Sequence, residues 1–298
     1  MKHIIDGAFI SMLEARDLQM QKPMRGFFGG MRQSKTYGSS VEFADYREYM
    51  AGDDLRRIDW NIYTRFQKLY LRLYHDERQF HHRIYLDGSA SMAWGKPEKG
   101  EVALRLAAAL SYLSVKSLDR VSVHILHGDK SENLSGTVVG RQAFYKAADL
   151  LNGVDFFGES ELDKAILSAE NVGHDDGLSV IISDFFTESD WKSAVDYLLF
   201  RGREVHLIQV VSPDELSPAL SGKLQLMDRE APTAEDSRHY MSDIGRAAKK
   251  AYDKAFLWHQ NDIRQFCESR GVGFFSVSTH QSIEEMLFLK ATEARLIK

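Results

Sequence analysis

One short stretch of this sequence places an acid and two hydroxyls where they could hold a metal ion. Asp87, Ser89 and Ser91 stand at alternate positions directly after Ile84, Tyr85 and Leu86, an apolar run typical of a β-strand. Carboxylate and hydroxyl oxygens are hard ligands, which suit Mg²⁺ better than they suit thiophilic metals. Aspartate and serine at a strand end also commonly hydrogen-bond the following turn. The stretch alone therefore leaves a metal site and a structural turn both open.

Two further segments carry the same kind of side chain. A second apolar run, 179–182, leads into Ser183 and Asp184, and between the two runs Ser160 stands in a loop that precedes a helical pattern. Because the carboxyl ends of parallel strands meet at one edge of a sheet, we expect these loops to share a crevice there. The sequence therefore predicts a metal site, with this set of ligands: Asp87, Ser89, Ser91, Ser160 and Asp184.

From residue 83 onward, short apolar strands alternate with helical patterns, which is typical of an α/β fold with a doubly wound, mostly parallel, Rossmann-type sheet. The expected strands are 83–87, 121–126, 179–183, 204–211 and 273–278, with a short edge strand at 133–139. The expected helices are 100–118, 141–151, 161–170, 191–200, 237–270 and 282–289. This pattern defines one domain over residues 81–298.

Residues 1–80 are expected to form an N-terminal, β-rich extension. It reads as a short helix at 9–20, a basic loop at 21–40 and aromatic, charged strands at 41–73. Buried charges must be paired, so we expect a half-buried sheet surface with ion pairs here, and a docking surface is the alternative. The expected ion-pair partners are Arg47, Asp53, Asp54, Arg56 and Asp59. His81 and His82, where the extension meets the domain, are expected at a strand entrance that faces solvent.

Composition narrows the class of protein. With 298 residues and 44% hydrophobic residues, the chain can bury one large α/β core plus a smaller appendage. Its single cysteine, Cys267, excludes an internal disulfide framework, and a cytoplasmic location is expected. No stretch is apolar enough for a signal core or a membrane span, so we expect no membrane contact. The basic loop lacks any recognised nucleic-acid module, so we expect no nucleic acid either.

The three candidate loops resemble a known metal site. Asp87-x-Ser89-x-Ser91, Gly158-x-Ser160 and Ser183-Asp184 are similar to the metal-ion-dependent adhesion site of von Willebrand factor A domains. The resemblance implies that the three serines bind Mg²⁺ directly and the two aspartates mainly through water, with Mn²⁺ or Ca²⁺ as other possible ions. It also implies that an acidic residue of a partner protein fills an open position on the metal. That family usually has threonine where this chain has Ser160, which keeps the hydroxyl.

A narrower resemblance comes from the extension. The segment 38–43, the stretch Tyr46 to Trp60 and the segment 68–72 resemble the signature of the bacterial "domain of unknown function 58" family. Proteins of that family resemble partners of MoxR-type AAA+ ATPases. The resemblance implies an adaptor or chaperone-type role for a module that binds proteins through a divalent metal.

We expect no enzymatic activity. The sequence contains no Gly-x-Ser-x-Gly nucleophile elbow, no phosphate-binding glycine loop with lysine and no His-Glu-x-x-His motif. The alternative is a Mg²⁺-dependent phosphohydrolase with Asp87 as the nucleophile. Such sites generally have a second acid two residues later, where this chain has Ser89, and a nearby lysine.

Overall fold

The chain divides into two compact units in the computed structural model. The structure describes residues 5–19, 43–50, 52–74, 79–169, 177–218, 222–227 and 239–297, so the basic loop expected at 21–40 lies outside the described residues. Unit 1 comprises residues 1–21 and 80–298, and unit 2 comprises residues 22–79. The N-terminal helix α1 (Gly7–Glu14) belongs to unit 1, because its apolar side chains Phe9 and Leu13 are buried in that unit's core. The extension expected at 1–80 is therefore split between the units.

Unit 1 is built on a six-stranded sheet in the order β10-β7-β6-β3-β4-β5, parallel except for β5. This confirms the predicted α/β class with a mostly parallel sheet. The edge strand expected at 133–139 was misplaced, because β5 ends at Asn133 and Val138 touches β4 only through a single bridge to Val121. The strands are β3 (His81–Asp87), β4 (Arg120–His127), β5 (Lys130–Asn133), β6 (Leu178–Ser183), β7 (Glu204–Val211) and β10 (Gly273–Ser278).

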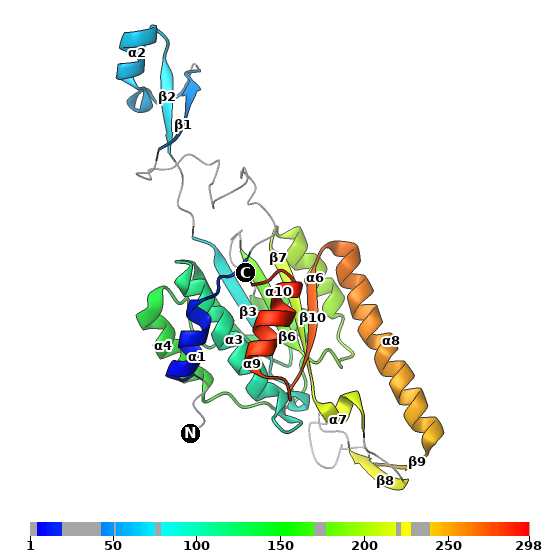
Figure 1. Cartoon of the computed structure of the whole chain (residues 1–298). Helices are drawn as coiled ribbons and strands as arrows, with labels where there is room; N and C mark the ends of the chain where they lie inside the picture. The colour runs from blue at the N-terminus through cyan, green and yellow to red at the C-terminus, as the bar shows by residue number, and fades with distance from the viewer. Residues whose placement is uncertain are drawn as a thin grey trace. The chain divides into compact units, whose positions relative to one another are not determined.

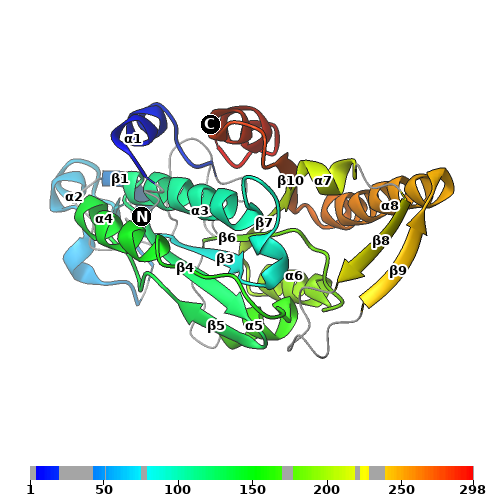
Figure 2. The same ribbon diagram turned by 90° about the horizontal axis from the view of Figure 1, so that it is seen from below.

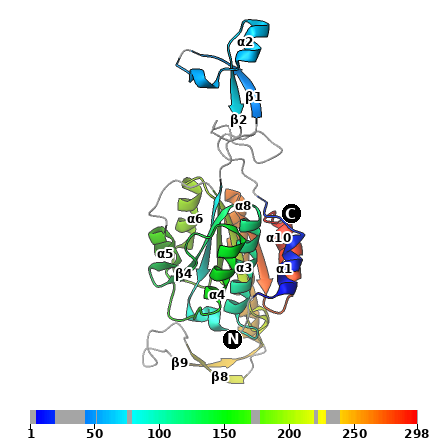
Figure 3. The same cartoon turned by 90° about the vertical axis from the view of Figure 1, so that its left-hand side faces the viewer.

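Helices cover both faces of this sheet (Figures 2 and 3). On one face, α3 (Lys99–Lys116) and α4 (Gly140–Leu151) pack with α1 and with the C-terminal turns α9 (Ile283–Glu285) and α10 (Ala291–Glu293). On the other face lie α5 (Leu162–Ala169), α6 (Trp191–Phe200) and part of α8 (Arg246–Arg270). None of the helices in the described ranges is both long and apolar enough to cross a membrane.

The order of the strands reverses at β3. The chain passes from β3 to β4 on one side and later returns to β6 on the other side of β3. Open α/β sheets bind ligands outside the carboxyl ends of the strands at such a reversal, because the connections diverge there. Asp87 ends β3 and Asp184 follows β6, so the two acids flank the reversal.

A small insertion follows β7. It contains the short helix α7 (Pro213–Leu216) and an antiparallel hairpin of β8 (Gly222–Met227) and β9 (His239–Ile244), which lies beside the start of α8 (Figure 1). The helix expected at 237–270 was therefore too long. Residues 239–244 pair with β8, and Gly245 separates them from the helix that begins at Arg246.

Unit 2 has a minimal core around Ile58 and Leu71. Strands β1 (Phe43–Glu48) and β2 (Tyr70–Tyr74) pair antiparallel, and a 3₁₀ turn (Leu55–Arg57) and helix α2 (Trp60–Phe66) stand between them in sequence. Asp59 accepts the Asn61 and Ile62 amides at the start of α2. Its Oδ2 also accepts hydrogen bonds from Arg72 Nε at 2.7 Å and Tyr46 Oη at 3.1 Å.

The ion pairs expected in unit 2 are present only in part. Arg47 contacts Asp53 at 2.6 Å, as expected. Asp59 pairs with Arg72, which was not among the expected partners, and Asp54 accepts the backbone amide of Arg56. Hydrogen bonding to the Arg72 guanidinium holds the pKa of Asp59 well below its usual range.

The amino end of β3 is buried, contrary to the expected solvent-facing entrance. His82 Nε2 lies 3.2 Å from Asp119 Oδ2, and His81 Nε2 lies 3.0 Å from Ser122 Oγ. The buried Arg203 donates to the carbonyls of His81 and Leu178, each at 2.7 Å. Sequence reasoning missed this burial because these partners lie far along the chain, at the start of β4 and directly before β7.

Candidate metal centre

Asp87 is the last residue of β3 and is 2% exposed. Its Oδ1 accepts the amide of Ser89 at 2.9 Å, and its Oδ2 accepts the hydroxyl of Ser183 at 2.6 Å. Burial, followed by the negative charge of Asp184, raises the pKa of Asp87 above its usual value, although these donors act in the opposite direction. The strand thus ends in a carboxyl that is costly to ionise without a nearby cation.

Ser89 and Ser91 face one another after this strand. Their hydroxyl oxygens lie 3.0 Å apart, a distance typical of a hydrogen bond. Two adjacent ligands of an octahedral Mg²⁺, each about 2.1 Å from the ion, also stand about 3.0 Å apart. The spacing of the two hydroxyls therefore fits adjacent positions on one small cation.

The loop with Ser160 is tied to the loop after β3. Ser160 Oγ donates to the carbonyl of Leu126 at 2.8 Å, and the same carbonyl accepts the Gly88 amide at 2.9 Å. The Ala90 amide also donates to the Gly158 carbonyl at 2.8 Å. Gly88 is required here, since a Cβ atom would stand 2.6 Å from that Leu126 carbonyl oxygen.

Asp184 is held by a tight turn after β6. Phe185 adopts a left-handed conformation with φ of 59°, which is uncommon outside glycine, and its amide donates to Ser183 Oγ at 2.9 Å. Asp184 Oδ1 accepts the Phe186 amide at 2.9 Å. Ser183, which bonds Asp87 with its hydroxyl, thereby joins the turn that carries Asp184 to the end of β3.

Lys99 approaches the other oxygen of Asp184. Its ammonium lies 2.6 Å from Asp184 Oδ2 and also contacts Glu215 Oε1, and the side chain is 1% exposed. Burial alone would lower the pKa of Lys99, but the carboxylates of Asp184 and Glu215 outweigh it and raise that pKa. Sequence reasoning missed both residues, because Glu215 lies 116 positions from Lys99 and only the folded chain brings them together.

The predicted ligands thus fall in loops that hydrogen bonds join at the strand ends. They supply two carboxylates and three hydroxyls, a donor set that suits a small hard cation. Within the described part of the chain, no group of three or more histidine, cysteine, aspartate or glutamate residues could hold a metal ion. A metal at this edge would therefore depend on the serine hydroxyls as well as on the two acids.

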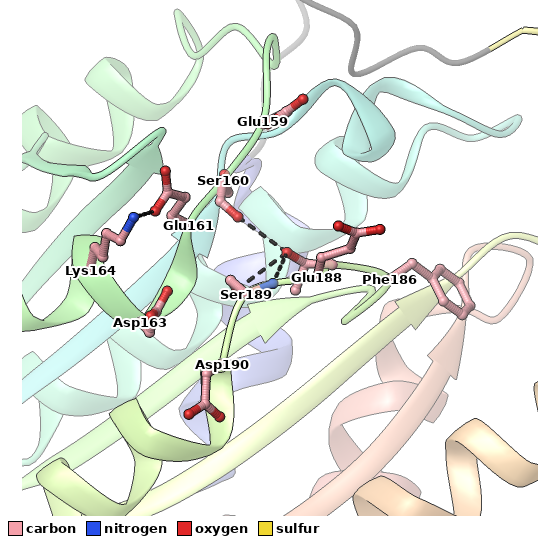
Figure 4. Close-up of a pocket in the computed structure, with 10 residues that line it drawn as sticks. Glu159, Ser160, Glu161, Asp163, Lys164, Phe186, Glu188, Ser189 and Asp190 are labelled. Atoms are coloured by element: carbon pink, nitrogen blue, oxygen red, sulfur yellow. Dashed lines mark hydrogen bonds and ion pairs between the residues drawn. The ribbon is translucent and has the colours of Figure 1, made fainter. Parts of the chain in front are cut away.

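An acidic hollow of about 650 Å³ lies beside Ser160 (Figure 4). Thr187 Oγ1 donates to the Ser160 carbonyl at 3.3 Å and accepts the Ser189 amide at 3.1 Å, which links the loop after β6 to this wall. Lys164 is paired with Glu161 at the start of α5. The acids that line the hollow are Glu159, Glu161, Asp163, Glu188 and Asp190.

Topology and donor set together define an α/β protein with a candidate cation centre at the carboxyl edge of its sheet. Residues 45–262 match the family model described as "Protein of unknown function DUF58", and the chain belongs to this family. The chain is similar to uncharacterized proteins of Mycobacterium bovis and Mycobacterium tuberculosis. It is 24% identical to each over 281 residues, which cover 93% of this chain and 86% of each relative.

Solved structures with a similar fold include von Willebrand factor A-type domains. The conserved hypothetical protein BatB from Bacteroides thetaiotaomicron is 14% identical with a TM-score of 0.45, covering 72% of this chain and 98% of its own. The SpRpn10 VWA domain is 11% identical with a TM-score of 0.36, covering 45% of this chain and 76% of its own. At this distance, the likeness assigns no function.

Proposed function

We propose that this chain binds one divalent cation through Asp87, Ser89, Ser91, Ser160 and Asp184, and that the ion takes a carboxylate from a partner protein. The observation that carries the proposal is the shared Leu126 carbonyl, which fixes the Ser160 loop against the Asp87 loop. A bound Mg²⁺ would supply a Lewis-acidic position for that carboxylate. The three serines would hold the ion, and the two aspartates would offset its charge.

The partner's identity follows from the family resemblance. We propose a MoxR-type AAA+ ATPase, for which this chain would act as an adaptor or chaperone-type subunit. Fold alone does not define function, so this step depends on the family and on the chemistry of the site together. We also propose the cytoplasm as its compartment, as the single cysteine led us to expect.

Calorimetric titration of chelator-treated protein with Mg²⁺ and then Mn²⁺ tests the metal step. We expect one site in the wild type, and affinity at least about 100-fold weaker in Asp87→Ala and about tenfold weaker in Ser89→Ala, because ligands and their supports control affinity. Ser111→Ala and Asp149→Ala are matched controls. Ser111 is a buried serine bonded within α3 and Asp149 an exposed acid on α4, so both variants should bind as the wild type does. Equal binding by Asp87→Ala would contradict the proposal.

The partner step needs its own assay. Capture of a purified MoxR-type AAA+ ATPase should occur with Mg²⁺, disappear with chelator and disappear in Asp87→Ala. Capture that persists with chelator and in Asp87→Ala would show that the partner binds elsewhere on the chain.

One observation keeps the phosphohydrolase as a second candidate. A lysine of the kind that such an enzyme uses is present, since Lys99 contacts Asp184. A parallel assay with p-nitrophenyl phosphate separates the two functions. Metal-dependent turnover that is lost in Asp87→Asn would replace the binding module with a hydrolase, whereas binding without turnover supports the module.

A further inference from the structure

Lys99 is a cation that the fold itself places beside the candidate metal centre. It is the first residue of α3, and its side chain is 1% exposed. Two carboxylates from distant elements hold the ammonium: Asp184 after β6 and Glu215 in α7. A lysine is buried this deeply only when it is paired, so these contacts fix its charge in place.

Glu215, the second acid that contacts Lys99, is itself held by hydrogen bonds. Its Oε2 accepts the Ser212 amide at 2.7 Å, and its own amide donates to Ser212 Oγ at 3.3 Å, a reciprocal pair that starts α7. Tyr252 from α8 donates to the Glu215 carbonyl at 2.8 Å. Hydrogen bonds therefore hold Glu215 in place, and its other carboxylate oxygen, Oε1, accepts the Lys99 ammonium.

These residues set the charge of the centre. When ionised, the carboxylates of Asp87, Asp184 and Glu215 and the ammonium of Lys99 leave a formal excess of two negative charges. One divalent cation would cancel that excess. Without Lys99 the excess would be three, and Glu215 would lose the cation that occupies its free oxygen.

We propose that Lys99 is a built-in counter-ion that matches the candidate centre to divalent cations and keeps Glu215 out of the metal's ligands. The inference depends on the proposed function, since it concerns the same site. Repulsion between Lys99 and a bound ion grows in proportion to the ion's charge. Removal of the ammonium should therefore strengthen binding of every multivalent cation, and of trivalent ions most.

The test compares Mg²⁺ and Tb³⁺ binding to the full chain and its variants. Lys99→Met keeps most of the side-chain volume and removes the charge, and we expect Mg²⁺ to bind about tenfold more tightly. A tenfold gain for a dication corresponds to about 30-fold for a trication, because the electrostatic free energy scales with charge. Lys99→Arg retains the charge and should bind both ions within about threefold of the wild type. Adding Asp87→Asn to Lys99→Met should abolish the gain if the ion occupies this centre.

The outcomes separate this inference from the proposed function. Binding of Mg²⁺ by Lys99→Met but not by the wild type would overturn both proposals, because the ammonium would then exclude the ion and not match the centre to it. Wild-type binding that Lys99→Met leaves unchanged or weakens would overturn the counter-ion alone. No binding by either protein would overturn both.

A second variant decides the matter if circular dichroism shows that Lys99→Met fails to fold. Glu215→Gln removes one negative charge, leaves Lys99 and retains an amide oxygen that can accept the Ser212 amide. We expect Mg²⁺ to bind about tenfold more weakly in Glu215→Gln, the opposite direction from Lys99→Met. Unchanged affinity, or no binding to either the wild type or Glu215→Gln, would overturn the counter-ion.

Discussion

The two ends of β3 are both buried and polar, yet their charges are arranged differently. At the amino end of β3, Asp119 contacts His82 and the Phe80 amide, and at the same end of the sheet Glu204 contacts His206 in β7. At the carboxyl end, the negative charge of Asp184 opposes the ionisation of Asp87 and raises its pKa, and Lys99 is the ammonium paired with Asp184. At the amino end every one of these acids has a donor beside it, whereas at the carboxyl end Asp87 also lies beside a second acid.

This difference separates a structural end from a functional one. Paired polar groups at the amino end fix where the strands start, and their removal should destabilise the fold. Like charges in a buried site cost free energy, and such arrangements are common where a protein binds an ion or performs chemistry. Stability should therefore depend on the amino end and cation binding on the carboxyl end.

The largest expected effect on stability comes from Arg203→Met. It leaves the carbonyls of His81 and Leu178 without their buried donor, which should lower the free energy of unfolding by about 3–5 kcal/mol. Urea denaturation measures this change. The exposed Arg264→Met is the matched control and should change stability by less than about 0.5 kcal/mol. A large loss of Mg²⁺ affinity in folded Arg203→Met would break the proposed separation of the two ends.

A smaller loss is expected for Asp119→Asn. The carbonyl oxygen of the new side chain can still accept the Phe80 backbone amide, but the carboxylate that contacts His82 is lost. We therefore expect the free energy of unfolding to fall by about 1–3 kcal/mol. Urea denaturation in the presence of chelator reports the change, with Asp149→Asn as an exposed control. A loss of stability smaller than that of Asp149→Asn would show that the contact between Asp119 and His82 does not stabilise the amino end.

Asp87→Asn should change how the free energy of unfolding depends on pH more than it changes that free energy at low pH. Because the pKa of Asp87 is raised in the folded chain, its contribution is fully present below the unfolded value, near 3.8, and is lost as pH rises through the folded value. Without metal, the free energy of unfolding of the wild type should therefore fall relative to that of Asp87→Asn as pH rises above about 4. At the acid end of this range the two proteins should agree within about 1 kcal/mol. Parallel curves would contradict a like-charge cost at this end.

The smallest effect on the stability of the whole chain is expected at Asp59, a carboxyl whose pKa is lowered where that of Asp87 is raised. Its pKa is lowered in unit 2, chiefly by Arg72, so its contribution is present above the unfolded value and is lost as pH falls below about 4. Nuclear magnetic resonance of the Trp60 indole should report local unfolding in acid. Asp59→Asn should lose the folded indole signal at neutral pH or show no further acid transition, whereas Asp54→Asn should behave as the wild type.

The sequence allowed much of this arrangement to be predicted. The strands that end in Asp87 and Ser183 each contain a short apolar run, 84–86 and 180–182, which is typical of buried parallel strands, and their order in the chain implied a shared edge. The hairpin strand 239–244 was missed because local pattern alone merged it with the following helix. Lys99 was assigned no role because nothing near it in the chain indicates its burial. Its partners come from α7 and from the turn after β6.

The bridge between Leu18 and Ile297, reinforced by the hydrogen bond from the Gln19 amide to the Leu296 carbonyl, has a consequence for synthesis. Unit 1 is made of chain on both sides of unit 2, so the segment that follows α1 completes its pairing only after residues 296–297 have been synthesised. Phe9 and Leu13 belong to the same core as Leu296 and Ile297, so their burial is incomplete until those residues have been made. A nascent chain arrested before residue 296 should therefore expose apolar side chains of α1 to which a chaperone could bind.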